Sequence, residues 1–343
     1  MKKLLSMAPM EGLTGYVYRR AHHSHFLPLD AYYTPFISNK KLGTREKHDI
    51  LPEHNANMHV IPQILTNKST DFMEIEKQLY EYGYREVNLN LGCPSATVTA
   101  KGRGAGFLKY PEELSMFLDE IYSKTNMEIS IKTRIGTDSE EEWPILLEIF
   151  NRFPIKQLTI HPRLLKDFYK GNVHINCYNY AQENALSTLC YNGDIHCVDN
   201  WKKIRQYIGT KTNEIMLGRG LLKDPALAEK IAEYEEGMED VNVTAETKEH
   251  LREEKAIVLE ADTVKTQRMN DKEAARLKKF HDAVLEGYCE EMSGDRNVLF
   301  KMKELWVYMG EGLQVAPKLL KSIKKANSVR EYKLISEMIF REI

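Results

Sequence analysis

The sequence lacks several features that would place it in common protein classes. Its five cysteines include no CxxC pair and no Cys/His cluster at zinc-finger spacing, so neither a zinc site nor a redox dithiol is expected. No uncharged apolar run is long enough to cross a bilayer, and Pro9, Glu11 and Gly12 cut short the apolar start of the chain. We therefore expect a cytoplasmic monomer with free thiols, without a signal peptide, a metal or a membrane contact.

An excess of one charge is also missing. The chain has 48 Lys and Arg residues against 50 Asp and Glu residues, which gives a formal net charge of −2. A balance this close to zero argues neither for nor against a nucleic-acid partner. Any RNA site must therefore be a local basic patch.

A GxGxxG fingerprint is absent from the first predicted helix, so a Rossmann dinucleotide site is unsupported. Instead, short β-rich runs alternate with amphipathic helical stretches; the runs cover residues 4–8, 31–36, 60–65, 87–91, 129–133, 157–161, 189–192 and 215–218. About eight such βα units over ~230 residues predict an α/β fold of the (β/α)8 TIM barrel type. An open doubly wound sheet is the alternative, but polar residues follow nearly every predicted strand instead of one switch point.

The last third of the chain shows no strand pattern. Residues 233–240 form an acidic, glycine-punctuated stretch typical of a linker, and helices are expected beyond it, among them 274–288 and 300–309. Breaks are expected near Gly294, at 310–312 and at Pro317. We predict a barrel domain over residues 1–236 and an all-helical domain over 245–343, with little periodicity in 244–267.

The stretch 87–94 is the centre of the predicted site. Alternating apolar and asparagine residues predict a buried strand that ends at Gly92 and Pro94, so Cys93 lies at a strand exit, where barrels carry reactive groups. A small buried hydrophobe is the other interpretation of a lone cysteine. The glycine-rich segment 101–106 contributes Lys101 and Arg103, and suits either a flexible lip over an anionic substrate or a solvated loop.

Two later loops suit phosphate binding. Residues 192–194 (Asn-Gly-Asp) follow the seventh predicted strand, and residues 218–220 (Gly-Arg-Gly) follow the eighth. Glycine backbones allow close approach and expose N–H donors, while Arg219 adds a planar cation. Plain turn glycines are the alternative.

A basic stripe is predicted near the C-terminus. It consists of Lys318, Lys321, Lys324 and Lys325, whose spacing places them on one helix face, with Arg296, Lys301 and Lys303 nearby in sequence. Such a face can track a phosphate backbone or simply be solvated.

Six segments, taken in order, resemble the tRNA-dihydrouridine synthases, flavin enzymes that reduce uridine in transfer RNA. They are residues 8–12, 90–94 with the glycine-rich loop, 131–134, 161–163 with Tyr169, 191–194 and 216–220. The family more often has Gly, Thr and Gln where this chain has Pro162, Leu164 and Asp167. These departures put the nucleotide contacts of that loop in doubt, and the target uridine is not identified by them.

The resemblance implies an FMN-dependent enzyme that reduces the 5,6-double bond of uracil in tRNA with NADPH as reductant. Hydride would pass from flavin N5 to C6, and Cys93 would be the catalytic acid that protonates C5. The cofactor-binding residues it implies are Pro9, Met10, Glu11, Gln63, Lys132, His161, Asn192, Gly193, Asp194, Gly218 and Arg219. It implies base contacts for Asn90 and Arg163, and we assign tRNA contacts to Lys101, Arg103 and the basic stripe.

Two other enzyme classes remain open at this point. An FMN-dependent oxidoreductase of the dihydroorotate or enone type would share the barrel and the phosphate loops. An aldolase would use Lys132 as a Schiff-base lysine without any flavin. Taken singly, His161 also suits a structural histidine.

Overall fold

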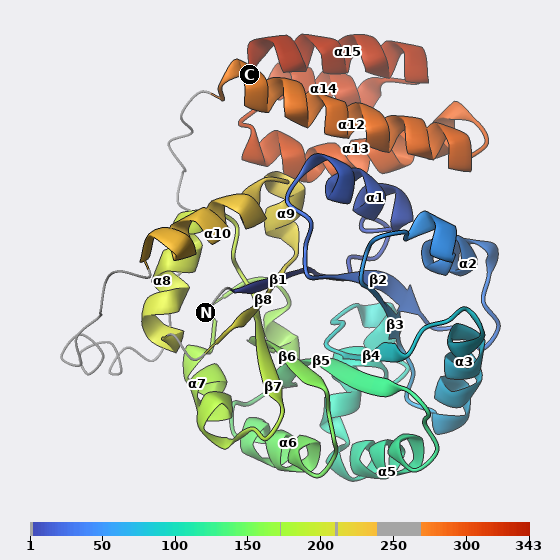
Figure 1. The fold of residues 1–343 in the computed structure, drawn as a ribbon, viewed down its shortest axis with the longest axis vertical. Helices are drawn as coiled ribbons and strands as arrows, with labels where there is room; N and C mark the ends of the chain where they lie inside the picture. Colours follow the sequence, from blue (N-terminus) through green and yellow to red (C-terminus); the bar gives the residue numbers. More distant parts are fainter. Residues whose placement is uncertain (1–2, 172, 210–211, 239–268) are drawn as a thin grey trace.

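The computed structural model describes residues 3–171, 173–209, 212–238 and 269–343. Eight parallel strands close into a barrel in sequence order, which confirms the predicted TIM barrel (Figure 1). The barrel closes where Leu4 pairs with Glu214 of the last strand. The strands are β1 (Leu4–Met7), β2 (Ala31–Ile37), β3 (Val60–Ile64), β4 (Glu86–Leu91), β5 (Glu128–Gly136), β6 (Gln157–Leu164), β7 (Thr188–Asn192) and β8 (Glu214–Leu217).

The longer helices pack around the barrel because they bury apolar residues on one face. In α5 (Pro111–Tyr122), for example, Leu114, Phe117, Leu118 and Ile121 are buried. The other helices of this part are α1 (Tyr16–His25), α2 (Thr44–Ile50), α3 (Ser69–Glu81), α4 (Ala96–Thr99), α6 (Glu142–Asn151), α7 (Ile175–Asn184), α8 (Val198–Ile208), α9 (Arg219–Lys223) and α10 (Leu227–Met238), with short 3-10 turns η1 (Pro52–His54), η2 (Gly104–Lys109) and η3 (Leu165–Asp167).

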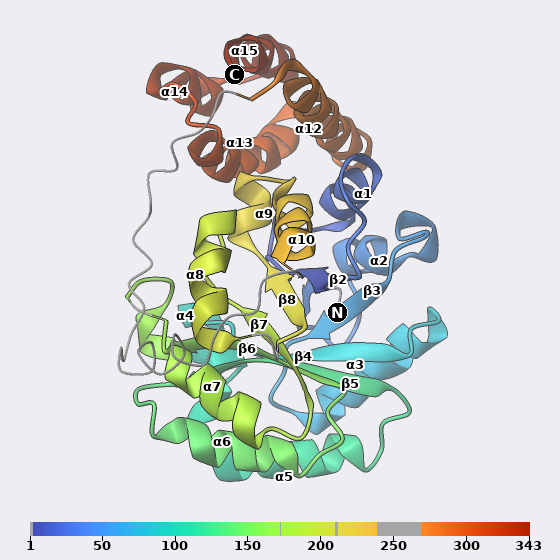
Figure 2. The same ribbon diagram turned by 60° about the vertical axis from the view of Figure 1, so that its left-hand side comes forward.

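The chain from residue 269 onward is helical, as predicted. It contains α12 (Asp271–Glu291), α13 (Asp295–Gly312), α14 (Pro317–Lys325) and α15 (Val329–Glu342). We call these four helices the helical region. It lies beside α1 and α9, on the side of the barrel where β1 meets β8 (Figures 1 and 2).

Specific contacts join the helical region to the barrel. The ring of Phe280 on α12 lies 5.4 Å from that of Tyr18. Glu291 accepts a hydrogen bond from the Tyr16 hydroxyl at 2.7 Å, and Lys301 of α13 donates to the carbonyl of Gly12 at 2.6 Å. These contacts fix α13 above the loop that follows β1.

Of three local predictions, two were wrong. Residues 233–238 of the predicted linker 233–240 continue α10 instead, and residues 239 and 240 lie outside the described part of the chain. The predicted break at 310–312 is confirmed, since α13 ends at Gly312; within the last turn Gly310 packs against α14, where a Cβ would lie 2.5 Å from Leu320 Cδ2. The glycine-rich segment is no open lip, because residues 104–108 are buried.

Two predictions about the C-terminal part stay untested. The stretch 244–267 lies outside the described residues, so the division into domains at 236 and 245 remains a prediction.

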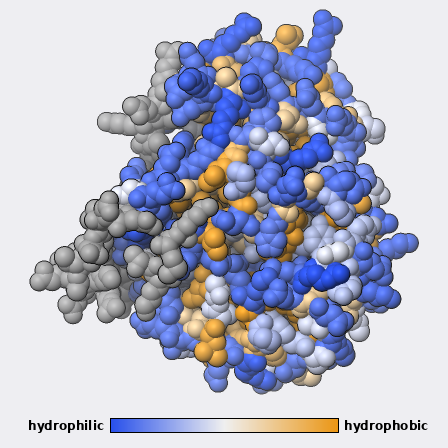
Figure 3. Space-filling model, in the orientation of Figure 1, coloured by the Kyte–Doolittle hydropathy of each residue, from blue (hydrophilic) through white to orange (hydrophobic). Residues whose placement is uncertain are grey.

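Among the helices that are described, none combines the length and the apolar character that a membrane span needs. The face in Figure 3 is mainly hydrophilic, with hydrophobic residues in scattered groups.

Candidate active site

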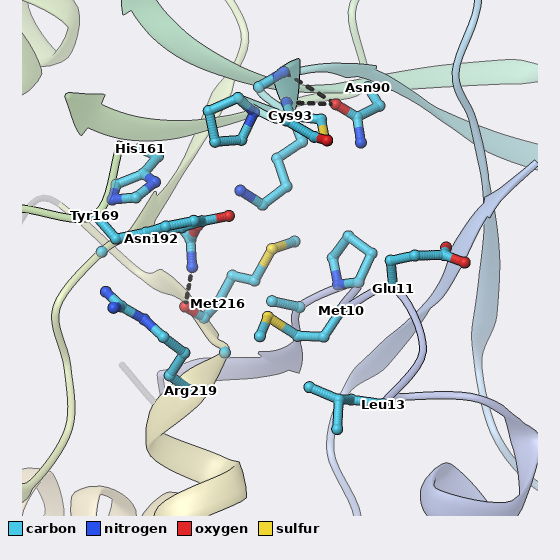
Figure 4. Close-up of a pocket in the computed structure, with 18 of the residues that line it drawn as sticks. Met10, Glu11, Leu13, Asn90, Cys93, His161, Tyr169, Asn192, Met216 and Arg219 are labelled. Carbon is cyan, nitrogen blue, oxygen red and sulfur yellow. Dashed lines mark hydrogen bonds between the residues drawn. The ribbon is translucent and has the colours of Figure 1, made fainter. Parts of the chain in front are cut away.

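A cavity of about 490 Å³ opens at the carboxyl ends of the strands, where a TIM barrel places its reactive groups. It is lined by Cys93, Asn90 and every residue predicted to bind the cofactor: Pro9, Met10, Glu11, Gln63, Lys132, His161, Asn192, Gly193, Asp194, Gly218 and Arg219. Cys93 and Asn90 lie on one side of it and Arg219 on the other (Figure 4). Predicted residues from distant parts of the sequence therefore share one cavity.

The turn that carries Cys93 is held by a side-chain amide. The Oδ1 atom of Asn90 accepts the main-chain N–H groups of Gly92 at 3.0 Å and Cys93 at 2.9 Å (Figure 4). The Nδ2 group of Asn90 donates to Gln63 on β3 at 2.8 Å. Gln63 in turn donates to Asn88 at 2.8 Å, so a chain of amides crosses the strands beneath the thiol. Asn90 thus positions the turn as well as lining the cavity.

Cys93 itself is suited to hold a proton. Burial raises the pKa of its thiol above the ordinary value, against the opposing charges of Arg134 and Lys132. The thiol therefore stays protonated at neutral pH. Its side chain is only partly buried and lines the cavity, where a substrate can reach it.

The glycine-rich segment supports this turn from behind. Gly104 has φ +56°, and a Cβ on it would lie 2.8 Å from the carbonyl oxygen of Cys93. Ala105 donates its N–H to the same carbonyl at 3.0 Å. Lys101 and Arg103 do not line the cavity, and the Arg103 guanidinium lies 3.8 Å from Asp71 on α3. Their predicted contact with the substrate, if it forms, lies outside this cavity and remains a prediction.

Lys132 and His161 provide the polar groups in the middle of the cavity. Burial, with the nearby charge of Arg134, lowers the pKa of Lys132 to about 8. Burial and the same cations hold the pKa of His161 well below its ordinary value, so its imidazole is neutral. Its Nε2 atom is buried without a hydrogen-bond partner in the described part of the chain. A bound ligand could satisfy that atom.

The loops after β7 and β8 meet closely at the other side of the cavity. A Cβ on Gly220 would lie 2.2 Å from the carbonyl oxygen of Ile195, so only glycine fits there. Asn192 donates to the carbonyl of Met216 at 2.7 Å and joins the two strands (Figure 4). Among the described residues, the main-chain N–H groups at positions 193–195 and 218–219 donate no hydrogen bond. These donors suit an anionic group.

Arg219 extends this donor set. One of its Nη atoms lies 3.0 Å from Asp194 Oδ1, and its guanidinium lies 4.8 Å from the centre of the Tyr169 ring. Glu11 differs from the other predicted residues, because its carboxylate pairs with Arg45 and points away from the centre of the cavity (Figure 4). Only its main chain is therefore available to a ligand there.

Arg134 is a site residue that the sequence interpretation missed. Its buried guanidinium donates to three carbonyls, those of Gly92 at 3.0 Å, Leu164 at 2.8 Å and Phe168 at 2.6 Å. It therefore joins the Cys93 turn to the loop after β6. Strand periodicity could have indicated it, since Lys132 and Arg134 are two residues apart and share one face of β5.

Arg163 has a different environment from the one predicted. Its guanidinium forms a buried ion pair with Asp194 and donates to the carbonyl of Gly171 at 2.8 Å. It does not line the cavity with Cys93 but a neighbouring one of about 670 Å³. Contact between Arg163 and the uracil base remains a prediction. Among the family departures, Asp167 accepts the N–H of Leu164 at 2.8 Å and orders this loop.

Two lining residues come from α13, a helix that no sequence pattern places at this cavity. Glu304 and Tyr308 line the cavity beside residues of the β1 and β8 loops. The predicted cations nearby are already engaged, since Lys301 bonds to Gly12 and Lys303 donates to the carbonyl of Ala326 at 2.6 Å. The basic stripe lies on α14, with all four lysines exposed.

Comparisons with known proteins agree on one family. The chain matches the family model described as dihydrouridine synthase (Dus) over residues 6–305. It is 28% identical over 233 residues to a probable tRNA-dihydrouridine synthase of Staphylococcus aureus (strain COL), covering 65% of this chain and 70% of that protein. It is 26% identical over 229 residues to tRNA-dihydrouridine synthase B of Pasteurella multocida (strain Pm70), covering 66% and 68%.

Similarity to solved structures is weaker. N-(5'-phosphoribosyl)anthranilate isomerase from Pyrococcus furiosus aligns with a TM-score of 0.44 and 11% identity, over 68% of this chain and 99% of that chain. A score this low carries no argument about function.

Proposed function

Because the chain belongs to the dihydrouridine synthase family, we propose that it is an FMN-dependent tRNA-dihydrouridine synthase that uses NADPH as reductant. The observation that carries the proposal is the placement of Cys93. A protonated thiol, fixed by Asn90, faces the same cavity as Lys132 and the two donor loops. This arrangement suits a reduction in which the protein supplies the proton.

The cavity residues fit FMN. The unused N–H groups of the β7 and β8 loops and the Arg219 guanidinium match a phosphate dianion. Lys132 and Gln63 are suited to the carbonyl and N1 side of the flavin ring, and His161 offers a buried Nε2 without a partner among the described residues. When bound, FMN supplies the hydride that adds to C6 of uracil.

The chain's own part in the reaction is the proton. Cys93 donates its Sγ proton to C5 of the uracil ring, and the resulting thiolate regains a proton from solvent. The raised pKa of the thiol keeps it loaded at neutral pH, while Lys132 and Arg134 stabilise the thiolate that the transfer leaves behind. Asn90 fixes the turn, so the donor does not have to be repositioned in each cycle.

The substrate must be able to present a uracil ring in this cavity. A uridine stacked in tRNA has to leave its stack before the ring can lie in the cavity. The lysines of α14 offer an exposed cationic face for the phosphate backbone. A small-molecule flavin oxidoreductase would have no use for this face, and the named relatives act on tRNA, so we favour tRNA as the substrate.

The test combines two measurements on the purified protein. We expect a flavin absorption spectrum, and a gain of two daltons on a uridine of tRNA incubated with the enzyme and NADPH. A flavin spectrum without that gain would favour a small-molecule substrate. A colourless protein that FMN does not reconstitute would contradict the proposal.

A further inference from the structure

One face of α13 runs along the rim of the catalytic cavity. Glu304 and Tyr308 line the cavity, and Phe300 lies one helical turn before Glu304. The spacing of four residues places the three side chains in a row. Val307 lies on the same exposed face. We call these four residues the α13 rim.

The apolar members of the rim are unusually open to solvent. Phe300 is 67% exposed and Val307 is 53% exposed. A single exposed apolar residue on a protein surface needs no explanation. Here, however, the exposed pair continues directly into Tyr308 and the cavity, so the apolar surface adjoins the place where a substrate enters.

Glu304 adds a specific polar group to this surface. Within the described part of the chain, its carboxylate has no hydrogen bond and no ion pair, although it lies close to the Gly12 loop. The loop and the helix are held together by the bond from Lys301 to the carbonyl of Gly12 at 2.6 Å. The carboxylate is therefore held at the rim with its acceptor oxygens unused.

The chemistry of these groups selects one kind of partner. An ionised carboxylate can only accept hydrogen bonds, and it repels phosphate. In contact with RNA, its favourable partners are the N–H donors on the edge of an unstacked base. The exposed ring of Phe300 beside it can stack on such a base. A carboxylate flanked by aromatic residues one helical turn away on either side therefore suits an unstacked base better than it suits the phosphate backbone of the RNA.

We propose that the α13 rim binds a nucleotide that flanks the target uridine in the substrate RNA. This inference rests on the proposed function. The unstacked base stacks on the exposed ring of Phe300, and Glu304, one helical turn closer to Tyr308 and the cavity, accepts hydrogen bonds from its Watson–Crick edge. Guanine fits best, because its N1–H and N2–H groups can meet both carboxylate oxygens. The rim thereby adds sequence preference beside the cavity, whereas the lysines of α14 add only charge.

The first test measures the affinity for a labelled tRNA by fluorescence anisotropy, without turnover. Phe300→Ala should raise the dissociation constant about tenfold, the loss expected for one stacking contact. Leu334→Ala is the matched control, since Leu334 is 64% exposed on α15 and does not line the cavity. Equal affinities of the two variants would overturn the proposal. A change in sedimentation coefficient for Phe300→Ala alone would also overturn it, by assigning the rim to a second copy of the chain.

The second test concerns the base. Wild type should prefer transcripts with guanine beside the target uridine over matched transcripts with adenine, and Glu304→Gln should lose most of that preference. A preference that Glu304→Gln leaves unchanged would contradict the role of the carboxylate. Dihydrouridine formation is measured separately: if wild type makes none, the proposed function fails, while the affinity contrast between Phe300→Ala and Leu334→Ala still decides the role of the rim.

Discussion

The cations at the mouth of the barrel and those on α14 are used in opposite ways. Arg134 and Arg163 are buried, and their guanidinium groups are spent on main-chain carbonyls and on Asp194. The lysines of α14 stand in solvent, while Ile323 on the same helix is buried. Buried cations thus fix the shape of the site, and exposed ones remain available to a partner. Substitutions at the mouth of the barrel should therefore alter the rate of the chemical step, and substitutions on α14 should alter the affinity for RNA.

The sharpest test of this contrast is Cys93→Ala. We expect the variant to keep its flavin and the reduction of that flavin by NADPH, while dihydrouridine formation falls about 1,000-fold or more, since only the proton donor is lost. Cys289→Ala removes an exposed thiol from α12 and should behave as wild type. Product formation by Cys93→Ala at the normal rate would refute the assignment. Product can be quantified by mass spectrometry of digested tRNA.

The next largest effect should come from Arg134→Lys. A lysine keeps the charge but cannot reach the three carbonyls of Gly92, Leu164 and Phe168 together, so buried acceptors lose their partners. We expect a loss of about 2–4 kcal/mol in the free energy of unfolding, measured in urea, and a lower kcat. Arg152→Lys changes an exposed arginine and should cost less than ~0.5 kcal/mol. Similar losses in the free energy of unfolding of both variants would contradict the distinction between buried and exposed cations.

Lys132→Met should separate stability from function. The pKa of Lys132 falls from 10.5 to about 8 on folding, so the fold bears a cost below pH 8 that shrinks as pH rises from 8 to 10.5. Flavin-free Lys132→Met should therefore be more stable than wild type at pH 7, by at most about 3 kcal/mol, and the gain should vanish near pH 10.5. Flavin affinity should decrease. Thermal unfolding of apoprotein across pH values checks the first point, and equal flavin binding by both proteins would contradict the second.

The smallest effect is expected on α14. Replacing Lys318, Lys321, Lys324 and Lys325 by alanine should raise the KM for tRNA about tenfold at moderate salt and leave kcat unchanged. The slope of log affinity against log salt should also become shallower by up to about three. Four arginines at these positions should restore the slope. If neither set of replacements alters the slope of log affinity against log salt, the lysine face of α14 does not contact RNA and is only solvated.

The barrel and the contents of its cavity could be predicted because parallel strands gather their carboxyl ends at one face. Residues as distant as Pro9, Cys93 and Arg219 share a cavity for this reason alone. The glycine-rich segment was interpreted as a flexible lip, but its Gly104 has a packing role. The Cys93 carbonyl lies so close to Gly104 that a side chain there would clash with it. Composition does not distinguish these two uses of glycine.

The parts that could not be predicted depend on tertiary packing. Glu304 and Tyr308 reach the cavity only because α12 and α13 pack on α1 and α9, and no local pattern in α13 reports that docking. The family resemblance implies a base contact for Arg163, whereas its ion pair with Asp194 depends on a second loop. Such pairings between loops leave no signal in either loop alone.

The amide chain beneath the thiol has a consequence for the conditions under which the protein works. Gln63, Asn88 and Asn90 hold the Cys93 turn with groups that neither gain nor lose a proton, and the bonds among the three amides are buried. The position of the Cys93 thiol should therefore not depend on pH or on salt concentration. The pH profile of the reaction should accordingly report only the thiol and Lys132, and the framework around them should keep one geometry across the whole profile.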